Sequence, residues 1–166
     1  MKVVLIGFAC GGKTTVGKLV AARLGLPFVD TDELVCNMRS ASVSEIFAKQ
    51  GQEAFRKAES QVLRLIPQNA VVSCGGGTVL ADGFAEFVQQ NSTVIWLKVL
   101  PCKILQRLGD QPRPLFDGLS KDQLQCFVED RNKEYCKYAT IAINTDDISA
   151  QEVADKVVEY IGSVCG

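Results

Sequence analysis

The stretch Gly7-Phe8-Ala9-Cys10-Gly11-Gly12-Lys13-Thr14 decides the fold of this chain. It fits the pattern G-x-x-x-x-G-K-[ST], the phosphate-binding P-loop. An apolar run at 3–6 precedes it and predicts a buried strand, and apolar residues at helical spacing over 16–24 predict a helix behind it. A glycine-rich turn between a strand and a helix attracts anions, because backbone N–H groups converge there and the helix dipole favours negative charge. The motif therefore predicts a site for a nucleoside triphosphate.

Two side chains of the motif add chemistry to this backbone cradle. Lys13 can reach the β- and γ-phosphates, and the Thr14 hydroxyl can ligate Mg²⁺. The competing interpretation is a glycine-rich turn with no ligand. The strand before the motif and the helix after it favour the nucleotide site.

The composition is that of an ordinary globular protein. A length of 166 residues predicts a single domain over 1–166. The formal net charge of −1 gives no sign of nucleic-acid binding. No apolar run approaches the roughly 18 residues of a membrane span. Seven cysteines without C-x-x-C spacing favour a reduced, cytoplasmic protein over a disulfide framework or a zinc site. Because the chain has no His, acid–base chemistry must fall to Asp, Glu or Lys.

Strand and helix patterns alternate from one end of the chain to the other. The strands are predicted at 3–6, 26–29, 70–74, 93–98 and 141–143, the later helices at 32–38, 44–66, 82–90, 101–108, 120–136 and 149–161, and a loop at 109–118. Such alternation predicts an α/β fold of three αβα layers with a central five-stranded parallel sheet. In such a sheet ligands bind beyond the carboxyl ends of the strands, where the P-loop, residues 30–32 and residues 75–77 should meet.

Asp30-Thr31-Asp32 ends the second predicted strand. Because side chains at the end of a strand alternate between its faces, Asp30 and Asp32 are expected to point one way and Thr31 the other. One carboxylate can hold Mg²⁺, directly or through water, and the other can accept a proton or hydrogen bond from a substrate hydroxyl. An Asp in this place also commonly caps a helix, but the nearby P-loop favours a role in the chemistry.

Gly75-Gly76-Gly77 follows the third predicted strand and permits a ligand to approach the backbone closely. A structural turn is the alternative, although three consecutive glycines exceed what most turns need. This strand ends without the acidic residue that usually holds Mg²⁺ in P-loop proteins, so that task is expected to fall to Asp30.

Three arginines can bind carboxylates or phosphates. Arg113 lies between two prolines in a stiffened loop that can close over a nucleotide. For Arg56 and Arg131, a binding role and a solvated surface charge are equally consistent with the sequence.

Together these motifs resemble those of the shikimate kinases over nearly the whole chain. The matching pieces are the P-loop, D-T-D at 30–32, G-x-x-x-F-R at 51–56 with Gln52 in the place of a Glu, G-G-G at 75–77, R-P-L at 113–115 and R-x-x-x-Y at 131–135. The resemblance implies a P-loop fold like that of nucleoside monophosphate kinases. It also implies ATP-dependent phosphorylation of the 3-hydroxyl of shikimate, giving shikimate 3-phosphate and ADP on the route to chorismate and the aromatic amino acids.

The resemblance further implies a role for each candidate residue. The implied catalytic residues are Asp32 as base, with Lys13 and Arg113 on the transferring phosphoryl group. The implied ATP contacts are Cys10, Gly11, Gly12, Lys13, Thr14, Thr15, Arg107 and Arg113, and Arg107 resembles a position that stacks on adenine. The implied shikimate contacts are Asp32, Arg56, Gly76, Gly77 and Arg131, and the Mg²⁺ ligands are Thr14 and Asp30. A substrate-binding helical region at 32–62, a lid loop at 109–118 and a monomer are also expected.

Three other functions compete with this one. A gluconate kinase of the same fold also acts on a polyhydroxy acid, but the D-T-D, F-R and G-G-G set favours shikimate. A GTP-dependent switch would need N-K-x-D, and the sequence at 132–135 has Tyr135 in the Asp place. A non-catalytic nucleotide-binding module would not require Lys13, Asp32 and Arg113 together. Cys10 and Gly11 differ from the family's usual residues, which is tolerable because the loop binds through its backbone.

Overall fold

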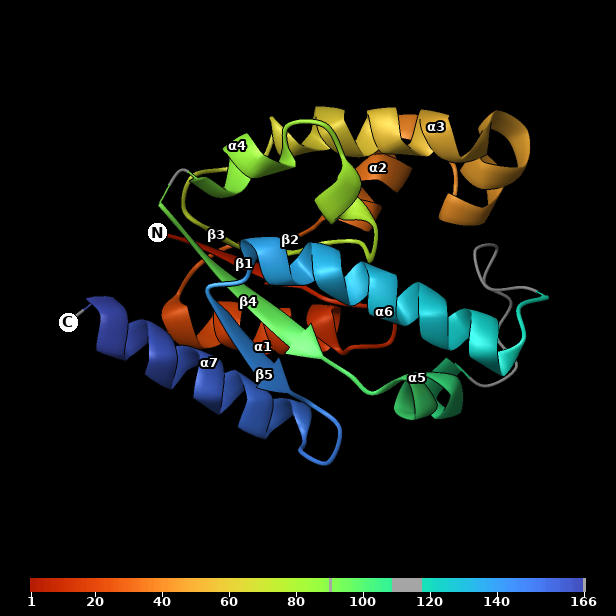
Figure 1. Ribbon diagram of the computed structural model, residues 1–166. Coiled ribbons are helices and arrows are strands. Elements are labelled where there is room, and N and C mark those ends of the chain that lie inside the picture. Colours follow the sequence, from red (N-terminus) through yellow and green to blue (C-terminus); the bar gives the residue numbers. More distant parts are fainter. Residues whose placement is uncertain (90, 109–117, 166) are drawn as a thin grey trace.

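The computed structural model describes residues 1–89, 91–108 and 118–165, so Arg113 and nearly all of the expected lid loop lie outside the described residues. Within them, five parallel strands form one sheet in the order β2-β3-β1-β4-β5 (Figure 1). The strands are β1 (Lys2–Ile6), β2 (Phe28–Asp30), β3 (Ala70–Ser73), β4 (Ser92–Lys98) and β5 (Ile141–Asn144). The predicted five-stranded parallel sheet is confirmed.

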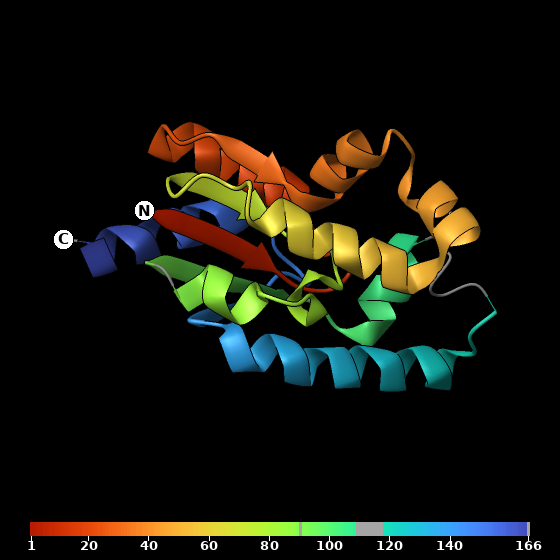
Figure 2. The ribbon, with the colours of Figure 1, turned by 90° about the horizontal axis from the view of Figure 1, so that it is seen from above.

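Helices cover both faces of the sheet. They are α1 (Lys13–Leu24), α2 (Thr31–Arg39), α3 (Val43–Leu63), α4 (Phe84–Gln89), α5 (Pro101–Leu108), α6 (Lys121–Tyr138) and α7 (Ala150–Cys165). Helices α1 and α7 lie on one face, whereas α4, α5 and α6 pack on the other with the end of α3 (Figure 2). The three αβα layers are therefore also confirmed.

The central strand explains this arrangement, because its side chains alternate between two apolar layers. Val3 and Leu5 pack with α1 and α7, and Val4 and Ile6 pack with α6. All five residues of β1 are buried, as expected for the middle of a parallel sheet. The P-loop leaves the carboxyl end of this strand, which places it at the centre of the sheet.

The strand before the two aspartates ends earlier than the sequence suggested. Strand β2 stops at Asp30, and Thr31 already begins α2. The prediction that Asp30 and Asp32 share a face by strand alternation is therefore wrong. Asp30 is the N-cap of α2, since its carboxylate accepts hydrogen bonds from the N–H groups of Asp32 and Glu33.

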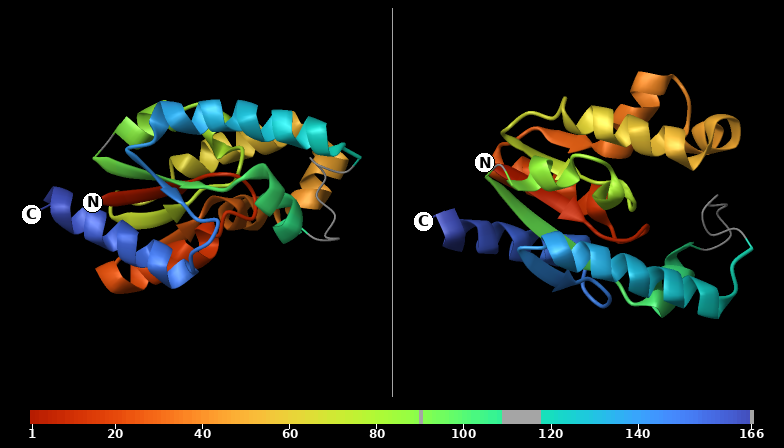
Figure 3. Two further views of the ribbon diagram at one scale, coloured as in Figure 1. Left: turned by 60° about the horizontal axis from the view of Figure 1, so that its bottom comes forward. Right: turned by 45° about the horizontal axis from the view of Figure 1, so that its top comes forward.

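Helix α3 is not the continuous helix predicted over 44–66. It starts at Val43 behind a capping box formed by Ser42 and Glu45. Gly51 interrupts it with φ 80° and ψ 174°, a backbone conformation open essentially to glycine alone. Beyond this break the helix runs back toward the sheet and carries Arg56 (Figure 3).

The glycine turn after β3 continues into a short 3₁₀-helix, η1 (Thr78–Leu80), which the sequence analysis did not predict. Among the described residues, none of the helices combines the length and apolar character needed to cross a bilayer.

Candidate functional site

A cavity of about 360 Å³ lies beyond the carboxyl ends of β1, β2 and β3. It is lined by residues of the P-loop, the start of α2, α3, the glycine turn and α6. Helices α3 and α6 stand on opposite sides of β1 in two views (Figures 2 and 3). The position agrees with the rule that parallel α/β sheets bind ligands at this edge.

The P-loop presents its backbone to this cavity. Gly12, at φ 78°, is the N-cap of α1 and supplies no side-chain cap, so the first N–H groups of the helix are left for a ligand. The positive end of the helix dipole points the same way. This end of the cavity is therefore built to bind an anion such as phosphate.

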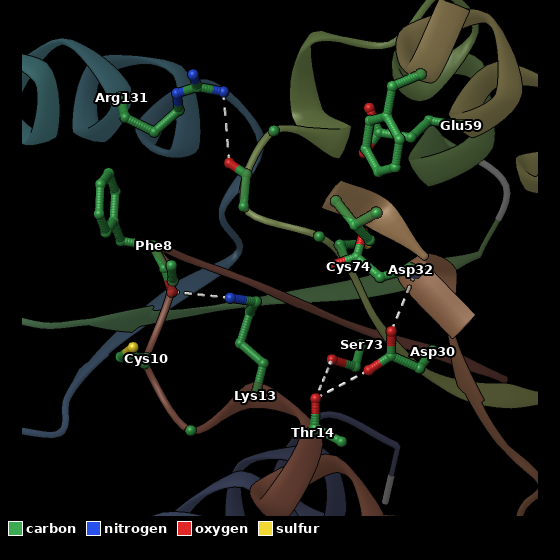
Figure 4. Close-up of a pocket in the computed structure, with 18 of the residues that line it drawn as sticks. Phe8, Cys10, Lys13, Thr14, Asp30, Asp32, Glu59, Ser73, Cys74 and Arg131 are labelled. Atoms are coloured by element: carbon green, nitrogen blue, oxygen red, sulfur yellow. Dashed lines mark hydrogen bonds between the residues drawn. The ribbon is translucent and has the colours of Figure 1, made fainter. Parts of the chain in front are cut away.

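Lys13 is buried beneath the loop, where its ammonium group donates a 2.8 Å hydrogen bond to the carbonyl of Phe8. Burial lowers the pKa of Lys13, while the nearby carboxylates of Asp32 and Asp30 act against that shift. The ammonium group thus lies within the phosphate cradle (Figure 4) and can exchange its carbonyl partner for a phosphate oxygen.

Thr14 and Asp30 form an oxygen pair at one end of the cavity. The Thr14 hydroxyl donates to one Asp30 carboxylate oxygen at 2.8 Å and lies 3.5 Å from the hydroxyl of Ser73. Among the described residues there is no cluster of three or more His, Cys, Asp or Glu side chains. The pair therefore fits a cation that takes few protein ligands and completes its shell with phosphate and water oxygens, as Mg²⁺ does.

Asp32 lies between this pair and the far end of the cavity (Figure 4). Burial, then the negative charges of Asp30 and Glu59, raise the pKa of Asp32 to about 6, against the opposing pull of Lys13 and Arg56. A carboxylate with such a pKa is ionised at neutral pH and is a stronger base than an exposed one.

Arg56 faces the cavity from α3 and is held there by a buried partner. Its guanidinium forms an ion pair with Glu59, whose side chain is 0% exposed. The other Glu59 oxygen accepts a 2.6 Å hydrogen bond from the Thr78 hydroxyl. Thr78 lies 3.3 Å from the hydroxyl of Thr31, which accepts a hydrogen bond from the N–H of Gly75 at 2.8 Å.

This network is not predicted from the sequence. Glu59 was detectable, because it lies three residues after Arg56 on the same apolar stripe as Phe55, Ala58 and Val62. A carboxylate on the core side of a helix requires a partner. Thr31 and Thr78 gave no such signal, since they meet only in the folded chain.

Two of the three glycines make room for side chains of the protein, whereas the prediction was room for a ligand. A Cβ atom at Gly75 would collide with the Asp32 carboxylate, and one at Gly77 would fall on the Arg56 guanidinium. The turn is thus packed against both of these residues, which presents its backbone to the same cavity.

Arg131 enters the cavity from α6 and is only 8% exposed, which excludes a solvated surface charge. It donates a long 3.4 Å hydrogen bond to the carbonyl of Gly76 and stacks over the Phe127 ring, 5.2 Å from its centroid. Burial lowers the pKa of its guanidinium, but arginine remains charged in proteins. Arg56 and Arg131 thus present two positive groups to one end of the cavity.

A second cavity of about 240 Å³ adjoins the outer side of the P-loop. Arg107 lines it and donates to the carbonyls of Thr145 at 2.8 Å and Cys10 at 3.4 Å. These contacts join α5, the P-loop and the segment after β5 around the second cavity.

The structure brings the described candidate residues together at these two cavities. The first cavity is lined by Cys10, Gly11, Gly12, Lys13, Thr14, Thr15, Asp30, Asp32, Arg56, Gly76, Gly77 and Arg131, and the second by Arg107 with Cys10, Gly11, Gly12 and Thr15. Arg113 lies outside the described residues.

Comparisons with known proteins point to one family. A family model described as shikimate kinase matches residues 9–162. A shikimate kinase from Moorella thermoacetica is 38% identical over 162 residues, covering 96% of this chain and 93% of the relative. The solved structure of shikimate kinase from Acinetobacter baumannii in complex with shikimate matches with a TM-score of 0.90 at 32% identity, covering 98% of this chain and 93% of that one. The structure from Aquifex aeolicus matches with a TM-score of 0.86 at 32% identity, covering 99% and 98%.

Proposed function

This chain belongs to the shikimate kinase family and is a phosphotransferase with an alcohol acceptor, and we propose that its two cavities hold the nucleotide and shikimate. The reaction moves the γ-phosphoryl group of ATP to the 3-hydroxyl of shikimate and yields shikimate 3-phosphate and ADP. Membership of this family excludes the GTP-dependent switch and the non-catalytic module. It also excludes gluconate phosphorylation as the main activity.

The P-loop holds the donor in this proposal. Residues 10–15 surround the phosphates, while Arg107 lies against the adenine in the second cavity. Lys13 leaves the Phe8 carbonyl and neutralises charge on the transferring phosphoryl group. Arg113 closes over the same group from the lid at 109–118.

Thr14 and Asp30 fit Mg²⁺, because they offer two adjacent oxygens at the phosphate end of the cavity. Thr14 binds it through its hydroxyl, and Asp30 directly or through water. When bound, the ion supplies positive charge to the phosphate oxygens during transfer.

The acceptor lies between the helical region at 32–62, which includes α3, and helix α6 on the opposite wall of the cavity. Arg56 and Arg131 hold its carboxylate, with the N–H groups of Gly76 and Gly77 beside them. Asp32 accepts the proton of the 3-hydroxyl as that oxygen bonds to phosphorus. In this proposal the base, Asp32, lies between the Thr14–Asp30 pair and the two arginines.

The observation that carries the proposal is this grouping of Asp32, Arg56 and Arg131 around one cavity with Lys13. It is tested by an ADP-release assay with shikimate, gluconate or no acceptor. Shikimate-dependent ADP release is expected. Turnover with gluconate but not with shikimate would rule the proposal out.

We also propose that residues 1–166 act as one kinase domain, as a monomer in the cytoplasm. A single sheet joining both ends of the chain supports the single unit. Sedimentation equilibrium of the full chain tests the monomer, which a dimer mass would contradict.

A further inference from the structure

Tyr135 is a fully buried side chain that contacts the glycine turn, whose backbone lines the cavity. It follows Arg131 by one helical turn on α6, so both residues lie on the inner face of the helix. Its ring packs against Trp96, with 5.9 Å between centroids. Its hydroxyl donates a short 2.6 Å hydrogen bond to the Gly76 carbonyl.

The same carbonyl therefore has two donors of unequal quality. The Tyr135 contact is short, whereas the Arg131 contact to the same oxygen is 3.4 Å long. A carboxylate is a stronger acceptor for a guanidinium than a backbone carbonyl is. An arriving substrate carboxylate can thus take Arg131 away from the carbonyl while Tyr135 keeps it bound.

Other hydrogen bonds fix the rest of the turn. The Gly75 N–H is bound by Thr31 at 2.8 Å, and the Gly75 carbonyl accepts from the Thr78 N–H at 3.1 Å. The Gly76 and Gly77 N–H groups have no acceptor among residues 1–89, 91–108 and 118–165. The Gly77 N–H lies in the same peptide plane as the Gly76 carbonyl, so the Tyr135 hydrogen bond fixes its direction. The Gly76 N–H lies in the plane of the Gly75 carbonyl, which the Thr78 N–H holds.

We propose that Tyr135 is a positioning residue for the acceptor: by binding the Gly76 carbonyl it fixes the direction of the Gly77 N–H and frees Arg131 for the substrate carboxylate. This inference rests on the proposed function. Burial raises the pKa of Tyr135, so its hydroxyl remains a donor throughout the working pH range. Tyr135 acts through backbone and Arg131, and touches neither ATP nor the transferring group.

The ordinary alternative is that the hydroxyl only satisfies a buried polar group and stabilises the fold. Loss of a purely structural hydrogen bond would lower thermal stability. It would not selectively weaken the binding of one of the two substrates. A positioning role predicts a selective effect on the acceptor.

The test is Tyr135→Phe, which keeps the ring and its packing against Trp96. The KM for shikimate should rise roughly fivefold, the factor expected for one hydrogen bond, while the KM for ATP and kcat stay within about twofold. Tyr138→Phe is the matched control, because Tyr138 lies on the same helix with its ring edge-on to Phe84 and should change neither KM. Equal changes in both KM values, or none, would overturn the inference.

A second measurement keeps the inference testable if Tyr135→Phe is less stable. Shikimate titrations of Arg131→Ala, Tyr135→Phe and the double variant, below the unfolding temperature, give a coupling free energy. The loss from Tyr135→Phe should be smaller when Arg131 is already absent, and additive losses would contradict a shared role. If the wild-type protein does not use shikimate at all, the proposed function fails; if it does and Tyr135→Phe behaves as wild type, only this inference fails.

Discussion

The backbone N–H of Asp32 donates a 3.0 Å hydrogen bond to a carboxylate oxygen of Asp30, whose other oxygen accepts from the hydroxyl of Thr14. One side chain thus caps the helix that carries the proposed base and also faces the phosphate end of the site. The capping role and the metal role, which are alternatives in the sequence, coexist in Asp30.

Asp30→Asn separates these two roles, because Asn caps helices about as well as Asp but offers no charge to a cation. We expect the Mg²⁺ concentration for half-maximal activity to rise about tenfold, with the melting temperature nearly unchanged. A titration of activity with Mg²⁺ at fixed ATP measures the first, and a thermal melt the second. An unchanged Mg²⁺ requirement would remove Asp30 from the metal site.

Asp32→Asn should lower kcat by about a hundredfold or more, the usual contribution of a general base. The KM for ATP should change less than about twofold. The free energy of unfolding should not fall. Because the pKa of Asp32 in the folded protein lies above its ordinary value of 3.8, the ionised carboxylate destabilises the fold. This destabilisation is complete above about pH 6 and absent below 3.8. A kcat near that of the wild type would exclude Asp32 as the base.

The pH profile follows from the same carboxylate. Because the ionised form accepts the proton, activity should fall as the pH drops through about 6, the raised pKa of Asp32. Rates at fixed ionic strength from pH 5 to 8 provide the check; a rate that rises toward pH 5 would contradict this assignment.

How far the sequence predicts the structure depends on whether a feature is local. The P-loop motif, the five strands and the burial of Val3, Val4 and Leu5 follow from local pattern, and all appear in the structure. The break at Gly51 does not, because a glycine within a helical pattern fits both a continuous and an interrupted helix.

The site shows the same division. Asp32 and Arg131 could be identified from their motifs. The hydrogen bonds from Thr78 to Glu59 and from Tyr135 to the Gly76 carbonyl join segments far apart in the sequence, so no local pattern predicts them. Asp32 lies in a helix rather than at the predicted strand end for a related reason. An Asp after a short apolar run can end a strand or cap a helix, and only the observed end of β2 at Asp30 separates the two.

Gly77→Ala tests the packing of the glycine turn. The added Cβ would fall on the Arg56 guanidinium and push it from the cavity, so shikimate affinity should fall at least about tenfold while nucleotide affinity is kept. Gly162→Ala is the control, because a Cβ there meets nothing within 4 Å and Gly162 lies within α7. Titrations with shikimate and ATP compare the two variants; equal shikimate affinities would show that the turn does not set the position of Arg56.

Arg113→Ala tests the lid. Loss of its charge from the transferring group should lower kcat by about a hundredfold while the dissociation constant for shikimate stays within about twofold. Rapid-quench turnover and equilibrium shikimate binding measure the two quantities. A variant with normal kcat would exclude a lid role for Arg113.

The most direct test of the account is to identify the phosphorylated product by ³¹P–¹H correlation NMR after incubation with Mg²⁺, ATP and shikimate. We predict a single new phosphate ester whose phosphorus couples to the proton on carbon 3 of shikimate, formed in equal amount to ADP. A phosphate on another hydroxyl, or ADP without any phosphorylated shikimate, would contradict the placement of Asp32 beside the 3-hydroxyl.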